Sequence, residues 1–162
     1  MKHCFTFLLA LSLLLLTTNS WAIDNDDTRL LWQPAISKDH IAFIYAEDLW
    51  VANRDGAYPR RITASEGLES NPVFSPDGSM IAFTGQYDGN TDVFLVPVSG
   101  GIPKRLTWHP SADLVRDFSP DGKKIAFIAR GDVYLIAAKE GGDAMRVTNT
   151  VSTESDIAWA AN

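Results

Sequence analysis

The chain has 162 residues, of which 46% are hydrophobic and 10% are aromatic, and its formal net charge is −6. This composition predicts a globular protein and argues against intrinsic disorder. The net negative charge disfavours nucleic acid and anionic lipid as partners.

The N-terminal segment has the layout of a secretory signal peptide. Lys2 precedes an apolar run over 5–16, and small residues surround Ala22. The run is well short of the roughly 20 residues that a permanent membrane anchor needs. We expect cleavage after Ala22, which removes Cys4 and yields an exported, periplasmic or secreted chain without a disulfide or a stable membrane anchor. An uncleaved anchor is the alternative.

An internal repeat with a spacing of about 40 to 44 residues organises the rest of the chain. Each copy contains Ile-Ala-Phe, then Asp before two apolar residues, then Arg-x-Thr. The triplets begin, in this order within each copy, at Ile41, Asp48 and Arg61, at Ile81, Asp92 and Arg105, and at Ile125, Asp132 and Arg146. Short β-rich segments at this spacing are typical of β-propeller blades, each built of four strands.

The predicted fold class is all-β: a partial, open β-propeller of about three four-stranded antiparallel blades plus the start of a fourth. No stretch after the signal peptide shows a sustained helical period. The predicted segments are a signal peptide over 1–22, a linker over 23–29, blades over 30–70, 71–113 and 114–155, and the first strand of a truncated blade over 156–162.

The second blade has the clearest strand and turn signals. After 72–74, Ser75-Pro76-Asp77-Gly78 has the residues of a type I turn, with Pro at the second position and Gly at the fourth. The following elements are predicted to be a strand over 80–84, a loop over 86–91, a strand over 92–97, a turn at Gly100-Gly101 and a strand over 104–108. The third blade repeats this order, with strands over 124–129, 132–137 and 145–149 and a turn at Gly141-Gly142, and the first blade is looser.

Blades bury their faces only by stacking against neighbours, and a propeller removes exposed faces by closing into a ring. Three blades and a stub leave apolar faces open on the first and last blades, and these faces are candidate surfaces for self-association or partner binding. A truncated gene or a fragmentary sequence is one explanation, and assembly of several copies into a ring is the other.

We expect no catalytic residue, no cofactor and no metal in this chain. Ser75 and Ser119 precede Pro-Asp-Gly, and no Gly-x-Ser-x-Gly elbow occurs. After cleavage the histidines are His40 and His109, whose spacing fits neither a catalytic triad nor a zinc site. The recurring aspartates lie at turn and strand-start positions, where a carboxylate can accept hydrogen bonds from nearby backbone N–H groups, and a calcium loop is the alternative. These residues are Asp77, Asp88, Asp92, Asp121 and Asp132.

The candidate binding surface combines the loop between the second and third strands of the second blade with the connection to the third blade. Both are expected on one face of the propeller. The residues that we predict to contact peptides or proteins there are Tyr87, Asp88, Asn90, Trp108 and His109.

Several motifs resemble the propeller repeats of tricorn-type and Tol-system proteins. These are the segment 72–78, Ile81-Ala82-Phe83, Asp92-Val93-Phe94 and Arg105-Leu106-Thr107. The segment 83–93 and Asp48-Leu49-Trp50 are similar to the opening blades of tricorn protease homologues. The resemblance covers 30–159, although 128–134 is more similar to a later blade, as blade-to-blade variation or an internal deletion would explain.

The resemblance implies a parent protein with propellers, a PDZ-like domain and a serine-peptidase region downstream. Since only the N-terminal part is matched, no catalytic residue can be transferred to this chain. The implied function is a non-catalytic propeller segment that gates or scaffolds substrates of an exported peptidase. The alternatives are a Tol-system-like periplasmic interaction module, or a propeller attached to another hydrolase such as an amidohydrolase.

Overall fold

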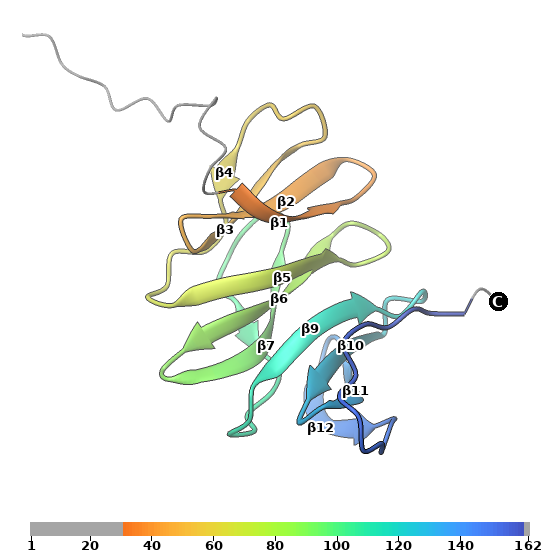
Figure 1. Cartoon of the computed structure of the whole chain (residues 1–162). Coiled ribbons are helices and arrows are strands. Elements are labelled where there is room, and N and C mark those ends of the chain that lie inside the picture. Colours follow the sequence, from red (N-terminus) through yellow and green to blue (C-terminus); the bar gives the residue numbers. More distant parts are fainter. Residues whose placement is uncertain (1–30, 161–162) are drawn as a thin grey trace, which may run out of the picture.

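The computed structural model describes residues 31–160, which form three separate β-sheets (Figure 1). Each sheet has four antiparallel strands in sequence order, and these residues contain no helix, and hence none that could span a membrane. The predicted all-β fold of open, four-stranded sheets is confirmed. The predicted signal peptide and linker lie outside the described residues.

The strands follow one another in chain order within each sheet. The first sheet contains β1 (Leu31–Ile36), β2 (His40–Tyr45), β3 (Asp48–Asn53) and β4 (Arg60–Arg61). The second contains β5 (Leu68–Phe74), β6 (Met80–Tyr87), β7 (Asn90–Pro97) and β8 (Lys104–Arg105). The third contains β9 (Asp113–Phe118), β10 (Lys124–Ala129), β11 (Asp132–Ala137) and β12 (Gly141–Arg146).

The sheets pack through their first strands, as blades around a propeller axis do. Strand β5 contacts β1 of the preceding sheet and β9 of the following sheet, and the three sheets follow one another in an open stack (Figure 1). Because the first strand of each sheet is nearest its neighbours, side chains on these strands can connect two sheets.

The apolar side chains of the repeat form two buried clusters, one for each contact between sheets. The cluster between the first and second sheets contains Ile44, Leu49, Ile81, Phe83, Phe94 and Val96, and the cluster between the second and third contains Leu95, Leu106, Val115, Ile125, Phe127 and Ile136. Phe83 and Ala82 of the repeated Ile-Ala-Phe motif are fully buried. The repeat therefore encodes the packing between blades.

The turn between the second and third strands of each sheet has two residues, both with positive φ. These turns are Ala46-Glu47, Asp88-Gly89 and Arg130-Gly131. Positive φ at both positions is the geometry of a type I′ turn, which matches the twist of a hairpin. The predicted loop over 86–91 is therefore wrong, because the strand ladder continues to the pair Tyr87–Asn90 around Asp88-Gly89.

The outer strands also differ from the prediction. Strand β8 has two residues, whereas a strand over 104–108 was predicted. Strand β12 begins at Gly141, where a glycine turn was predicted, because Ala137 pairs with Gly141 and residues 138–140 close the hairpin. Residues 156–160 are not in a strand, so the start of a fourth blade remains a prediction.

Candidate functional site

In the second sheet, an ion pair and a hydrogen bond join the third strand to the segment of the fourth. These contacts account for the recurring Asp and the recurring Arg-x-Thr motif. Arg105 Nη2 lies 2.6 Å from Asp92 Oδ2, and the backbone N–H of Val93 donates to Thr107 Oγ1 at 2.9 Å. The same contacts join Arg61 and Thr63 to β3 and Arg146 and Thr148 to β11. Asp92 and Asp132 lie near the start of their strands, and each also pairs with an Arg on the next strand, a partner that the turn interpretation did not include.

A buried carboxylate, that of Glu69 on β5, connects the first and second sheets. It accepts hydrogen bonds from the backbone N–H of Leu49 at 2.6 Å, from the hydroxyl of Thr63 and from the hydroxyl of Tyr87. Glu69 is fully buried, and burial raises the pKa of its carboxyl group. Both carboxylate oxygens thus have donors, as a buried charge requires.

Asp113 occupies the equivalent place between the second and third sheets. It precedes Ser119 by the same number of residues as Glu69 precedes Ser75. Its side chain is 1% exposed, yet Oδ1 has no hydrogen-bond partner within the described part of the chain. Burial raises the pKa of Asp113, and a hydrogen bond with the Thr107 side chain partly offsets this rise. The oxygen without a partner is Oδ1, and an unpartnered carboxylate oxygen at this depth is costly.

A cavity of about 390 Å³ adjoins Asp113. Its lining includes Trp108 and His109 from the connection between the sheets, and Phe127, Arg130 and Tyr134 from the third sheet. Arg130 donates to the Tyr134 hydroxyl at 2.6 Å. This volume is in the range of sites for small ligands, and its aromatic walls with a few polar groups are typical of such sites. Among residues 31–160, no three His, Cys, Asp or Glu side chains converge as metal ligands.

The residues predicted to bind peptides do not all lie on one surface. Most are near the connection between the second and third sheets, whereas Tyr87 lies at the contact between the first and second sheets. Asn90 Nδ2 donates to the backbone oxygen of His109 at 2.8 Å, which joins the hairpin to the connection between blades. Trp108 is 72% exposed and lies under the guanidinium group of Arg105, 4.1 Å from the ring centroid. Asp88 is exposed in the turn, whereas Tyr87 is half-buried against Glu69. The binding role of these residues remains a prediction.

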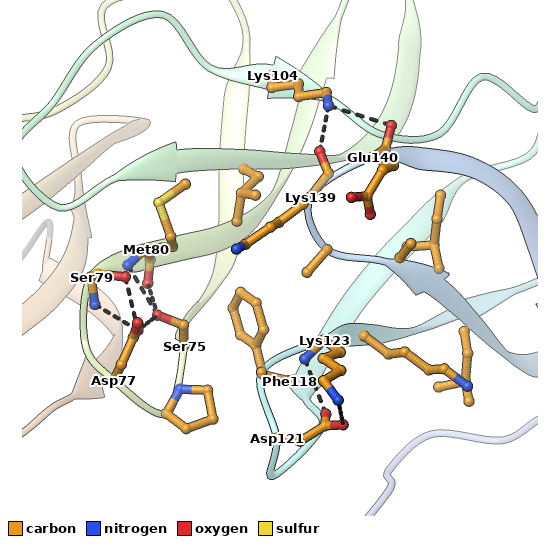
Figure 2. Close-up of a pocket in the computed structure, with 18 of the residues that line it drawn as sticks. Ser75, Asp77, Ser79, Met80, Lys104, Phe118, Asp121, Lys123, Lys139 and Glu140 are labelled. Carbon is orange, nitrogen blue, oxygen red and sulfur yellow. Dashed lines mark hydrogen bonds and ion pairs between the residues drawn. The ribbon is translucent and has the colours of Figure 1, made fainter.

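A larger groove of about 1190 Å³ lies between the second and third sheets, next to their Ser-Pro-Asp-Gly turns (Figure 2). Lys104 Nζ donates to the backbone oxygens of Lys139 and Glu140 beside it. The Ser75 hydroxyl donates to Asp77 Oδ1 at 2.5 Å, and this bond, together with those from Ser79, lowers the pKa of Asp77 to about 2. Ser75 and Asp77 therefore serve their own turn, as predicted.

An acidic residue near the start of the first strand of the second and third sheets was not predicted. The available signal was an acidic residue five positions before an aromatic residue: Glu69 before Phe74, Asp113 before Phe118 and Glu154 before Trp159. The backbone N–H of Glu154 donates to Gly131 O at 2.8 Å, as that of Glu69 donates to Glu47 O at 3.1 Å. The segment after the third sheet thus begins to dock as a following blade does.

A pH dependence follows from the burial of Asp113. Because its pKa is raised above the ordinary value of 3.8, the folded protein keeps this proton to higher pH than the unfolded chain. The free energy of unfolding therefore falls as pH rises between the two pKa values. We expect the fall from about pH 4 to about pH 7 to be smaller in Asp113→Asn than in the wild type, as measured by urea unfolding at each pH. An equal fall in Asp113→Asn and wild type, or an equal reduction in Asp117→Asn on the same strand, would contradict this assignment.

Comparisons with known proteins identify the same architecture. Residues 28–129 match the family described as the tricorn protease N-terminal beta propeller domain. Tricorn protease homolog 1 of Streptomyces coelicolor is 36% identical over 58 residues, which cover 36% of this chain and 5% of the relative. A TolB homolog of Chlorobium luteolum is 36% identical over 56 residues, which cover 35% of this chain and 13% of the relative.

A solved structure shows the same arrangement of sheets. The crystal structure of TolB from Acinetobacter baumannii superposes with a TM-score of 0.62 at 26% identity, over 75% of this chain and 33% of that one. The chain thus spans a small part of the length of the relatives that it matches. Since the family match covers more than half of the residues, including the first two sheets, the chain belongs to the family of tricorn protease N-terminal β-propeller domains.

Proposed function

We propose that the chain is a non-catalytic propeller segment of a tricorn-type exported serine peptidase, in which it gates or scaffolds peptide substrates. The observation that carries this proposal is the family match over 28–129, together with the stacked four-stranded sheets. Export is supported by the signal-peptide pattern over 1–22. Peptidase chemistry belongs, in this proposal, to other parts of the parent protein.

The proposed peptide-binding surface is the one that contains Trp108, His109 and Asn90. Trp108 offers an exposed aromatic ring held in place by Arg105, and exposed aromatic residues of this kind often dominate binding energy. The hydrogen bond between Asn90 and His109 holds the hairpin against the connection between blades. A rigid surface loses little conformational entropy when a peptide binds.

Titration of the isotope-labelled chain with a mixture of short peptides, followed by NMR, tests this surface. We expect Trp108→Ala to weaken peptide binding at least about fivefold, which corresponds to about 1 kcal/mol of binding free energy. Tyr58→Ala is the matched control, because Tyr58 is 81% exposed but lies on the first sheet's side of the molecule. Absence of peptide binding, or equal losses in both variants, would contradict the proposed function.

A second candidate is a Tol-system-like periplasmic module that binds other proteins, which the similarity to TolB supports. Reading the coding DNA beyond codon 162 separates the two. Further blades, a PDZ-like segment and a serine-peptidase region in frame would support the first candidate, and their absence would favour the second or a remnant.

We also propose that copies of the chain associate with one another. Exposed apolar side chains occur on the first sheet at Leu31, Trp32 and Ile36 and beside the third at Met145 and Val147. Gel filtration with light scattering would show whether copies of the chain assemble through these sheets. A monomer at all accessible concentrations would remove this part.

A further inference from the structure

At the contact between the first and second sheets, the phenol ring of Tyr87 occupies a site formed by neighbouring side chains. The ring of Tyr87 packs edge-on against Phe94, with 4.7 Å between centroids, and Phe94 stacks on Phe83 at 5.7 Å. The Tyr87 hydroxyl donates to Glu69 Oε1. An aromatic pair and an acidic oxygen thus hold one phenol side chain.

The third sheet repeats the aromatic pair, but no residue takes the place of Tyr87. Phe127 and Tyr134 stack at 5.6 Å with 26° between their planes, compared with 23° for Phe83 and Phe94. The hairpin of the third sheet ends at the pair Ala129–Asp132, whereas the second sheet continues by two further pairs to Tyr87–Asn90. The shorter hairpin therefore lacks the position from which Tyr87 reaches the sheet contact.

The cavity of about 390 Å³ lies where this tyrosine is missing. Its lining includes Phe127, Tyr134 and Asp113, the counterparts of Phe83, Phe94 and Glu69. It also includes Thr107 and His109, the counterparts of Thr63 and Ser65. Thr63 donates a hydrogen bond to Glu69, and the Ser65 side chain forms a hydrogen bond with the Tyr87 hydroxyl.

Arg130 takes a part of this space and leaves the rest open. Its guanidinium group lies 5.3 Å from the Tyr134 ring centroid and donates to the Tyr134 hydroxyl. It gives no hydrogen bond to Asp113, whose Oδ1 is left without a donor within the described residues. A planar guanidinium group beside the cavity can also stack on an aromatic ligand.

We propose that this cavity binds a phenol ring, whose hydroxyl donates a hydrogen bond to Asp113 and whose face packs against Phe127, Tyr134 and Arg130. The donor that Asp113 lacks is the group that Tyr87 supplies to Glu69. The phenol ring that fits the proposed function is the tyrosine side chain of a peptide, and this choice of ligand rests on the proposed function. A free phenolic compound has the same chemistry.

The first experiment titrates the full chain with 4-methylphenol and with 4-methylanisole, in which a methyl group replaces the hydroxyl proton. We expect 4-methylphenol to shift the NMR signals of Asp113, Ala129 and the Trp108 indole, with an affinity about tenfold higher than that of 4-methylanisole, the usual value of one hydrogen bond in a buried site. Equal affinities, or shifts confined to other sheets, would overturn the proposal.

Substitution of the acceptor provides a second readout. Asp113→Leu keeps the branching of the side chain but removes the acceptor, so we expect the preference for 4-methylphenol over 4-methylanisole to disappear. Asp117→Leu, on the same strand but outside the cavity lining, is the matched control and should keep the preference. Loss of the preference in both variants, or in neither, would contradict the role of Asp113.

The Tyr87 site, from which the phenol site is inferred, can be tested without any change to the third sheet. Tyr87→Ala opens the equivalent site beside Glu69, and we expect 4-methylphenol to raise the Tm of this variant more than that of the wild type. The matched compound 4-methylanisole should raise the Tm of this variant less than 4-methylphenol does. Failure of 4-methylphenol to restore Tm would show that the arrangement does not select a phenol ring.

N-acetyl-tyrosinamide and N-acetyl-phenylalaninamide distinguish the sources of the phenol. Binding of the tyrosine compound with shifts at Asp113 supports a peptide ligand. Binding of 4-methylphenol alone keeps the phenol site but contradicts its role in peptide recognition. Peptide binding that depends on Trp108, without any phenol preference, would overturn the phenol site and leave the proposed function intact.

Discussion

Replacement of Glu69 by alanine is expected to lower the free energy of unfolding by about 3–4 kcal/mol. The Glu69 carboxylate accepts hydrogen bonds from the Leu49 N–H and from the hydroxyls of Thr63 and Tyr87. Without it these donors remain in a buried contact between two sheets, where each unpaired group is costly. Urea unfolding of the full chain, followed by circular dichroism, would measure the loss.

A graded series makes this prediction specific. Glu69→Gln keeps an acceptor of similar shape, so its loss should be smaller than that of Glu69→Ala. Glu66→Ala is the matched control, because Glu66 is exposed in the same connection and should change stability by less than about 0.5 kcal/mol. If Glu69→Ala and Glu66→Ala have similar effects, Glu69 does not join the sheets in the way described here.

Replacement of Phe83 by alanine is expected to cost about 3–5 kcal/mol, as is typical of a large aromatic residue removed from a core. Phe83 is fully buried, stacks on Phe94 and belongs to the cluster between the first and second sheets. The substitution removes apolar area and leaves a cavity at the contact on which both sheets depend. Thermal and urea unfolding would measure the change.

Phe74 provides the comparison within the same sheet. It is a phenylalanine packed against the same cluster but is only partly buried, so Phe74→Ala should cost clearly less than Phe83→Ala. Equal costs would contradict the expectation that the loss of stability follows the burial of each ring at this contact.

The repeating pattern of the chain was sufficient to predict the four-strand repeat and the Ser-Pro-Asp-Gly turn, but not the full length of the β6–β7 hairpin or the bounds of β8 and β12. Ile-Ala-Phe recurs because the second and third copies place their phenylalanine in a cluster between sheets, and Ser-Pro-Asp-Gly recurs because its residues form a tight turn. Alternation of apolar residues and turn chemistry act over a few residues, so they can be read directly from sequence. The family resemblance, the open all-β fold and the turn role of Ser75 were predicted on this basis.

The functions of individual side chains depended on contacts between sheets. Tyr87 was predicted to face a ligand, yet its hydroxyl reaches Glu69, because the type I′ turn at Asp88-Gly89 extends the hairpin and carries Tyr87 over the sheet contact.

The amino-acid sequence by itself determined the four-strand repeat and the Ser-Pro-Asp-Gly turns, since these arise from interactions among neighbouring residues, whereas the bounds of β6, β8 and β12 did not follow from it. Only the tertiary structure decided that Glu69 is satisfied while Asp113 is left beside a cavity. Both residues occupy the same position of the repeat, and their environments differ because a hairpin two pairs longer supplies a tyrosine to one sheet contact and not to the other.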